Sequence, residues 1–157
     1  MKRVIAFFLL VSMLSLTSCD EAPVYEKVYS FENTIWDQQQ KLNFKVDIKD
    51  IDQEYDFIIT LRTTTDYNYN NLWIFLNTIT PSGKKAREPF EIKVTNPDGS
   101  WAGIKTGTIV EFPLKFNSRK LPEEGVYSFV VEQGITATEI TEVLDMGFRV
   151  DRASKEK

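Results

Sequence analysis

Apolar and polar residues alternate along most of the chain, which is the pattern of half-buried β-strands. The clearest case is residues 41–49, KLNFKVDIK, where Leu42, Phe44, Val46 and Ile48 alternate with polar residues. The further segments with this pattern are 55–63, 71–79, 90–95, 107–116, 126–133 and 144–150. The period of two predicts a β-strand in each of them.

Two of these segments depart from strict alternation. Residues 72–76 are apolar at every position, which predicts a central strand with Trp73 buried. Pro113 cannot donate a ladder hydrogen bond, so it indicates an edge or a bulge in the second half of 107–116. Turn sequences rich in Asn, Pro and Gly separate the strands at 66–71, 81–83, 96–99 and 121–125. Residues 136–143 are compatible with either a short helix or a loop.

About seven to eight short strands joined by turns predict an all-β protein, a single antiparallel β-sandwich. The pattern leaves open whether the topology is immunoglobulin-like or jelly-roll. We expect the sandwich domain to occupy residues 25–150. The charged residues 151–157 are expected to form a tail that frays.

The first eighteen residues have the pattern of a signal peptide. Lys2 and Arg3 precede an apolar run at 4–16 that only serines interrupt. A membrane-spanning helix needs about 20 apolar residues, so this run is too short to be one.

The sequence Leu16-Thr17-Ser18-Cys19 resembles a bacterial lipobox, with an aliphatic residue and two small ones before a cysteine. We therefore expect cleavage between Ser18 and Cys19 and lipidation of Cys19 by acyl chains such as palmitate, with 19–24 as a tether. Each buried methylene contributes about 0.8 kcal/mol, and two or more chains anchor a protein stably. The alternative is an incidental cysteine beside an ordinary signal peptide, which Leu16 disfavours.

Composition excludes several functional classes. The net charge is −4 and becomes −6 when Lys2 and Arg3 are removed, so nucleic acid is not an expected partner. The chain has no histidine and no recognisable catalytic motif. We expect no catalytic residues, no metal and no cofactor. Glu123, Glu124 and Asp145 are interpreted as solvated surface charge, and 96–99 as a turn rather than a calcium loop.

Aromatic residues beside amides are the remaining chemical signal. Tyr67, Tyr69, Asn71 and Trp101 are the candidate partner surface, because such groups anchor protein interfaces or stack on sugars. The alternative is that the rings pack inward, which we favour for Trp36 and Trp101 at the ends of the sandwich. For Tyr67 and Tyr69 the two interpretations are evenly balanced.

An ordered set of segments resembles the gliding motility lipoprotein GldH family of the Bacteroidota, over about residues 24–150. The segments are FENTIW, LRTTTDYNYNNLWIF, PSGK, GSWAGI, GVYSFVVEQ and VLDMGFRV. Asn68 stands where the family's middle motif has proline. The resemblance implies an envelope lipoprotein tied to gliding and type IX secretion, with Cys19 as the lipidated residue. It implies no catalytic residues.

The expected function is therefore non-catalytic: a lipid-anchored protein that supports gliding or secretion-associated assembly through protein–protein contacts. Its expected partners are the membrane and other envelope lipoproteins or type IX secretion and motility components. The alternative is a glycan-binding surface lipoprotein; a hydrolase using carboxylates ranks third. Because the resemblance is to Bacteroidota, where acidic residues after the cysteine accompany export, Asp20 and Glu21 favour the outer membrane. The face of that membrane stays open.

Overall fold

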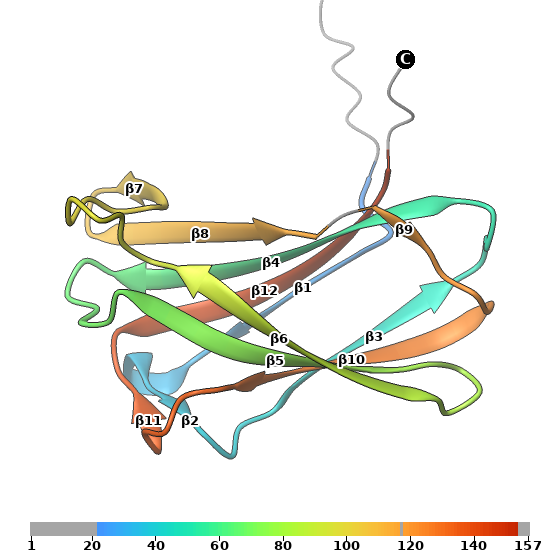
Figure 1. Cartoon of the computed structure of the whole chain (residues 1–157), viewed down its shortest axis with the longest axis horizontal. Helices are drawn as coiled ribbons and strands as arrows, with labels where there is room; N and C mark the ends of the chain where they lie inside the picture. The colour runs from blue at the N-terminus through green and yellow to red at the C-terminus, as the bar shows by residue number, and fades with distance from the viewer. Residues whose placement is uncertain (1–21, 117, 154–157) are drawn as a thin grey trace, which may run out of the picture.

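The computed structural model describes residues 22–116 and 118–153, which form two antiparallel β-sheets packed face to face (Figure 1). This confirms the predicted all-β sandwich. The strands are β1 (Tyr25–Ser30), β2 (Trp36–Asp37), β3 (Leu42–Ile48), β4 (Glu54–Thr64), β5 (Asn71–Ile79), β6 (Lys85–Lys93), β7 (Ile104–Thr106), β8 (Ile109–Lys115), β9 (Arg119–Lys120), β10 (Gly125–Gln133), β11 (Glu139–Ile140) and β12 (Val143–Arg152). A 3₁₀ turn, η2, spans Glu32–Thr34. No helix within the described residues is long and apolar enough to cross a membrane.

The strand order identifies the topology that the sequence left open. The first sheet runs β1-β12-β4-β8-β7, with β9 paired to the start of β4, and the second runs β3-β10-β5-β6. The strands β2 and β11 form a separate small pair. The long strands pair from the outside of the sequence inward: β1 with β12, β3 with β10, β4 with β8, and β5 with β6. This rolled-up hairpin is a jelly roll.

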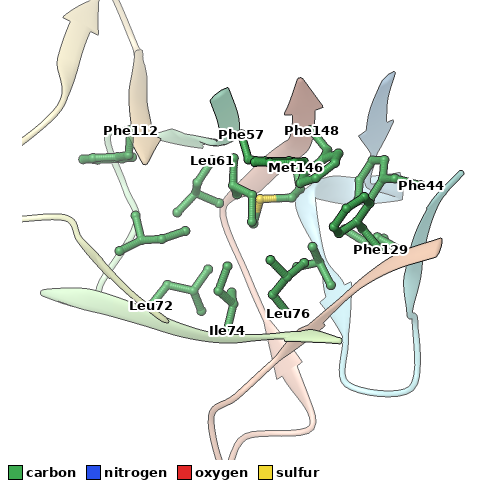
Figure 2. Packing of buried hydrophobic residues seen from close by; sticks show 14 of the residues in the cluster. Phe44, Phe57, Leu61, Leu72, Ile74, Leu76, Phe112, Phe129, Met146 and Phe148 are labelled. Atoms are coloured by element: carbon green, nitrogen blue, oxygen red, sulfur yellow. The ribbon is translucent and has the colours of Figure 1, made fainter. Parts of the chain in front are cut away.

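The core lies between the two sheets and is rich in phenylalanine. Phe129 from β10 lies 5.5 Å from Phe57 and 5.1 Å from Phe148, measured between ring centroids. Figure 2 shows aliphatic side chains of β5 pointing from the second sheet toward Leu61 and Met146 of the first. Each fully buried side chain of this kind contributes about 1.5–3 kcal/mol relative to exposure. With no disulfide available, the fold is held by this packing.

The two open sides of the sandwich are closed by side chains. On one side the hydroxyl of Tyr29 in β1 donates to the carbonyl oxygen of Asn43 in β3 at 2.8 Å. On the other side the rings of Phe90 and Phe116 meet edge to face at 4.5 Å. Pro113 pairs with Thr60 of β4 at a point that β7 does not reach, so it lies on an edge, as predicted.

A bulge in β12 changes which way Asp145 faces. The register with β4 shifts between Val143 and Asp145, so Asp145 lies opposite Arg62. The Arg62 guanidinium donates to both carboxylate oxygens, at 2.8 Å from Nε and 2.5 Å from Nη2. Asp145 is only 6% exposed, so the expectation of a solvated charge was wrong. The bulge turns Asp145 to the outer side of the sheet, where Arg62 covers it.

The sandwich has two ends that differ in what they carry. The near end holds the start of β1, the start of β4 and the end of β12, because Tyr25 pairs with Val150, which pairs with Phe57. The far end holds residues 65–70 after β4 and 94–103 after β6, here called the far-end loops. In Figure 1 the near end is on the right and the far end on the left.

Several segments differ from the sequence-based expectation. The strand β6 spans Lys85–Lys93, so it begins before the predicted segment 90–95. Residues 25–30 form β1, which had not been predicted as a strand. For residues 136–143 the sequence was compatible with a helix or a loop; residues 136–142 form a loop that contains β11, and residue 143 begins β12. The strand β12 continues to Arg152, so residues 151 and 152 of the expected tail are paired with β4.

Candidate partner surface

The fold brings the candidate residues together at the far end. The carbonyl oxygen of Asn70 accepts hydrogen bonds from the amides of Val94 at 2.9 Å and Thr95 at 3.1 Å. Thr95 in turn forms an isolated β-bridge with Trp101. The loop that carries Tyr67 and Tyr69 therefore lies beside the loop that carries Trp101.

Tyr67 and Tyr69 have different roles in their loop. Tyr67 is 5% exposed and its hydroxyl donates to the carbonyl oxygen of Asn71 at 3.4 Å. Burial raises the pKa of the Tyr67 phenol above its usual value. Tyr69 is 43% exposed and packs edge to face on Tyr67, with ring centroids 5.5 Å apart. Only Tyr69 of the two offers its ring to a partner.

Asn71 is already engaged within the fold. Its side-chain amide donates to Glu91 Oε1 at 2.6 Å, which ties the start of β5 to β6. Its backbone carbonyl accepts the hydrogen bond from Tyr67. Both polar groups serve the local structure.

The turn around Trp101 is dictated by close packing. The Trp101 ring is half-buried and lies 6.3 Å from Phe112. A Cβ at Gly103 would lie 2.3 Å from the carbonyl oxygen of Glu111, so only glycine fits there. The preceding 96–99 turn closes through a hydrogen bond from Gly99 to Asn96, as an ordinary turn does.

Trp36 packs inward, as we expected. It is fully buried, stacks on Phe31 at 5.1 Å and donates from Nε1 to the carbonyl oxygen of Gln40 at 2.9 Å. Buried tryptophan commonly satisfies its N–H in this way.

Trp73 was expected to be buried, and this was wrong. It is 42% exposed, because β5 turns Leu72, Ile74 and Leu76 into the core and leaves Trp73 and Phe75 on the outer side of the sheet. The unbroken apolar run concealed this alternation. Trp73 is therefore a candidate surface residue that the sequence interpretation missed.

Carboxylates are the remaining side chains that could support catalysis or bind a metal. Glu123 accepts hydrogen bonds from the Ser82 side chain and amide, which lower its pKa. A shallow hollow of about 210 Å³ on the first sheet contains Glu26, Glu111 and Asp145. Arg62 donates to both oxygens of Asp145, so this carboxylate is held in a bidentate ion pair within the fold. Among the described residues no group of three His, Cys, Asp or Glu side chains could hold a metal.

Ser18 and Cys19, the predicted cleavage and lipidation residues, lie outside the described residues. The described chain is fixed from Val24 onward, whose amide donates to the carbonyl oxygen of Val150 at 2.8 Å. The predicted anchor therefore precedes the near end of the sandwich.

Fold and surface together define a single-domain jelly-roll sandwich whose exposed rings and amides gather on loops and on one sheet. The sequence model of the GldH lipoprotein family matches residues 23–150. The chain belongs to this family of gliding motility lipoproteins, which are proteins of the cell envelope. This confirms the resemblance found in the sequence.

Two curated proteins are similar along nearly their whole length. The gliding motility lipoprotein GldH homolog of Christiangramia forsetii is 28% identical over 155 residues, 94% of this chain and 94% of that protein. The gliding motility lipoprotein GldH of Flavobacterium johnsoniae is 27% identical over 151 residues, 92% of this chain and 94% of that protein.

The solved structure of the infectious bursal disease virus VP2 subviral particle is a distant likeness. It is 13% identical with a TM-score of 0.34, over 84% of this chain and 32% of that one. The chain spans about a third of that protein, and a likeness of this size informs no function.

Proposed function

We propose that this protein is a non-catalytic lipoprotein, anchored in the outer membrane through acylated Cys19. Its role is to support assembly of gliding or type IX secretion components through contacts with other envelope proteins. Membership of the GldH family supports the proposal, since the two curated relatives carry gliding motility in their names.

The observation that carries the proposal is that the predicted anchor lies close to one end of the sandwich and far from the other. Five residue steps separate Cys19 from Val24, and a chain of that length reaches at most about 17 Å. An acylated Cys19 would therefore hold the near end close to the bilayer. From Phe57 to Thr64 the strand β4 extends about 23 Å away from that end. The body of the sandwich, with its outer faces and the far-end loops, would then project away from the membrane, where partners are reached.

The test is an affinity purification of the intact lipoprotein from crosslinked native membranes, with Cys19→Ala as the control. We expect gliding or secretion proteins to co-purify with the intact protein and to be lost with the control. Recovery of no protein partner from either sample would overturn the assembly role. Equal recovery from both would retain the role but remove the lipid as the positioning device.

Glycan binding is the second candidate function, and the exposure of Tyr69 and Trp73 favours it. Aromatic faces stack on sugar rings. Tyr67 is buried and Trp101 is half-buried, so only the rings of Tyr69 and Trp73 are well exposed for such stacking. A glycan array probed with the protein and with Tyr69→Ala and Trp73→Ala variants discriminates the two functions. Specific binding that both variants lose would favour the glycan.

A further inference from the structure

The outward side of the sheet β3-β10-β5-β6, here called the open face, carries an exposed aromatic and basic surface. Alternate residues of each strand point away from the core, and cross-strand pairing arranges them in rows. One row holds Trp73 opposite Glu91, and the next holds Phe75 opposite Pro89. A further row holds Lys45 opposite Ser128, and Ser128 opposite Ile79.

The centre of the open face is an arginine fixed in position. The Arg87 guanidinium lies 4.0 Å from the centroid of the Phe75 ring. Its Nη1 donates to Glu132 Oε2 at 2.8 Å and to Asn77 Oδ1 at 3.2 Å. Such a side chain loses little further entropy on binding, which is the advantage of preorganisation. Tryptophan and arginine are the residue types most enriched in binding hot spots.

Charge is distributed unevenly between the two outer faces. On the first sheet three outward cations are paired with acids: Arg62 with Asp145, Lys115 with Asp56 at 2.7 Å, and Arg149 with Asp151 at 2.9 Å. Lys120 of β9 is the exception, since it is exposed and has no ion-pair partner among the described residues. On the open face, Glu132 pairs with both Lys41 and Arg87. Within the described parts of the chain, Lys45, Lys85 and Lys93 have no ion-pair partner. The open face is thus a basic surface on an acidic protein.

A groove of about 500 Å³ runs beside this centre. It is lined by Lys41, Asn77, Ile79, Lys85, Arg87 and Glu132, among others. Cations therefore border an apolar floor, which suits a chain segment that carries both carboxylates and an apolar side chain.

The amides of the open face already take part in hydrogen bonds within the fold, which disfavours a neutral sugar as occupant. Asn71 donates to Glu91, Asn43 Oδ1 accepts from Ser128, and Asn77 bonds both Arg87 and the Val130 carbonyl. Arg87 also covers the Phe75 ring, so that ring and Trp73 form no free platform for stacking. What stays available is positive charge and the Trp73 ring.

We propose that the open face is the docking surface for an acidic protein segment of an envelope partner. The partner's carboxylates pair with Lys45 and Lys85, and an apolar side chain packs against Trp73. This inference rests on the assembly role proposed above and names the surface that performs it. It moves the contact from the far-end loops to the sheet.

The test places a photo-crosslinking amino acid in the full-length lipoprotein in its native membrane. Val126, 53% exposed on the open face, carries the probe, and Val28, 47% exposed on the other face, carries the matched control. We expect an adduct only from Val126, with a protein whose crosslinked peptide is rich in Asp and Glu. Lys45→Glu with Lys85→Glu should reduce the adduct at least tenfold, and Trp73→Ala several-fold.

The charge change has its own control. Lys105→Glu with Lys120→Glu alters the net charge equally at exposed positions of β7 and β9, and should leave the adduct within twofold. An adduct with a polysaccharide or with a second copy of the chain would overturn the proposal, as would an adduct insensitive to Lys45 and Lys85. If the membrane purification still recovers envelope partners in that case, the assembly role stands and only the surface is wrong.

Discussion

The far-end loops and the open face both place aromatic rings beside amide side chains, yet they use them differently. In the loops Tyr67 is buried, and the Trp101 turn packs closely at Gly103. On the open face Trp73 projects from β5 opposite Glu91, and the same face carries lysines that have no ion-pair partner among the described residues. The comparison teaches that the aromatic cluster that stood out in the sequence mainly stabilises the loops. The ring that a partner can reach is Trp73, which lies in a strand.

The first prediction concerns Tyr67 and should have the largest effect. Replacing Tyr67 with Ala removes a ring that is 5% exposed and should lower the free energy of unfolding by about 3 kcal/mol. The matched change Tyr69→Ala removes an exposed ring and should cost less than about 1 kcal/mol. Urea unfolding of both variants measures the difference. Equal costs would mean that the loop is a binding surface rather than a structural one.

A second prediction concerns Gly103. Its alanine variant places a methyl group against the Glu111 carbonyl and the Phe112 ring, so the turn must shift, at a cost of about 2 kcal/mol. Gly83→Ala supplies a contrast, because no atom lies within 4 Å of the added Cβ there, although the backbone φ of +86° still strains it. Thermal unfolding should place Gly103→Ala below Gly83→Ala. The reverse order would refute the steric argument.

The sequence predicted the fold better than the surface, for identifiable reasons. Alternation found the strands that bury one face, but β1 is an edge strand with four exposed residues, so it shows no such pattern. A one-residue bulge at Leu144 places Asp145 opposite Arg62, whose guanidinium covers it, and no sequence signal marks a bulge of this kind.

Trp73 shows a different failure. The apolar run at 72–76 fits a strand buried on both faces. A strand with one buried face and an exposed aromatic face can have the same sequence pattern, so the run alone does not distinguish them. For Tyr67 and Tyr69, two residues apart in a loop, no periodicity decides which one points inward. The lipobox interpretation of Cys19 remains a prediction.

A third prediction uses pH to separate the regions. The hydrogen bond from Lys41, with a further one from Arg87, lowers the pKa of Glu132 despite desolvation. A carboxyl whose pKa is lower in the folded state stabilises the fold above its unfolded pKa of about 4.3, and this contribution is lost as the pH falls through the folded value. Glu132→Gln should therefore cost about 1 kcal/mol at pH 7 and little at pH 2.

The same variant should act oppositely on binding. Removing the negative charge from the centre of the open face leaves Lys41 and Arg87 free for an acidic partner, so the Val126 adduct should rise while stability at pH 7 falls. Denaturant titrations at the two pH values and the crosslinking yield test both parts. A fall in both quantities would show that Glu132 serves binding only by holding Arg87.

The smallest effect on stability is expected for Trp73→Phe, below about 0.5 kcal/mol, because the ring is largely outside the core. Of the three tryptophans in the chain, Trp36 is fully buried and Trp101 is half-buried. Trp73 should therefore account for most of the fluorescence that acrylamide quenches, and Trp73→Phe should remove that fraction. Trp36→Phe provides the contrast: it should destabilise the fold and leave the quenched fraction intact. If quenching survives in Trp73→Phe, the ring is covered, and the open face loses the anchor on which the docking proposal depends.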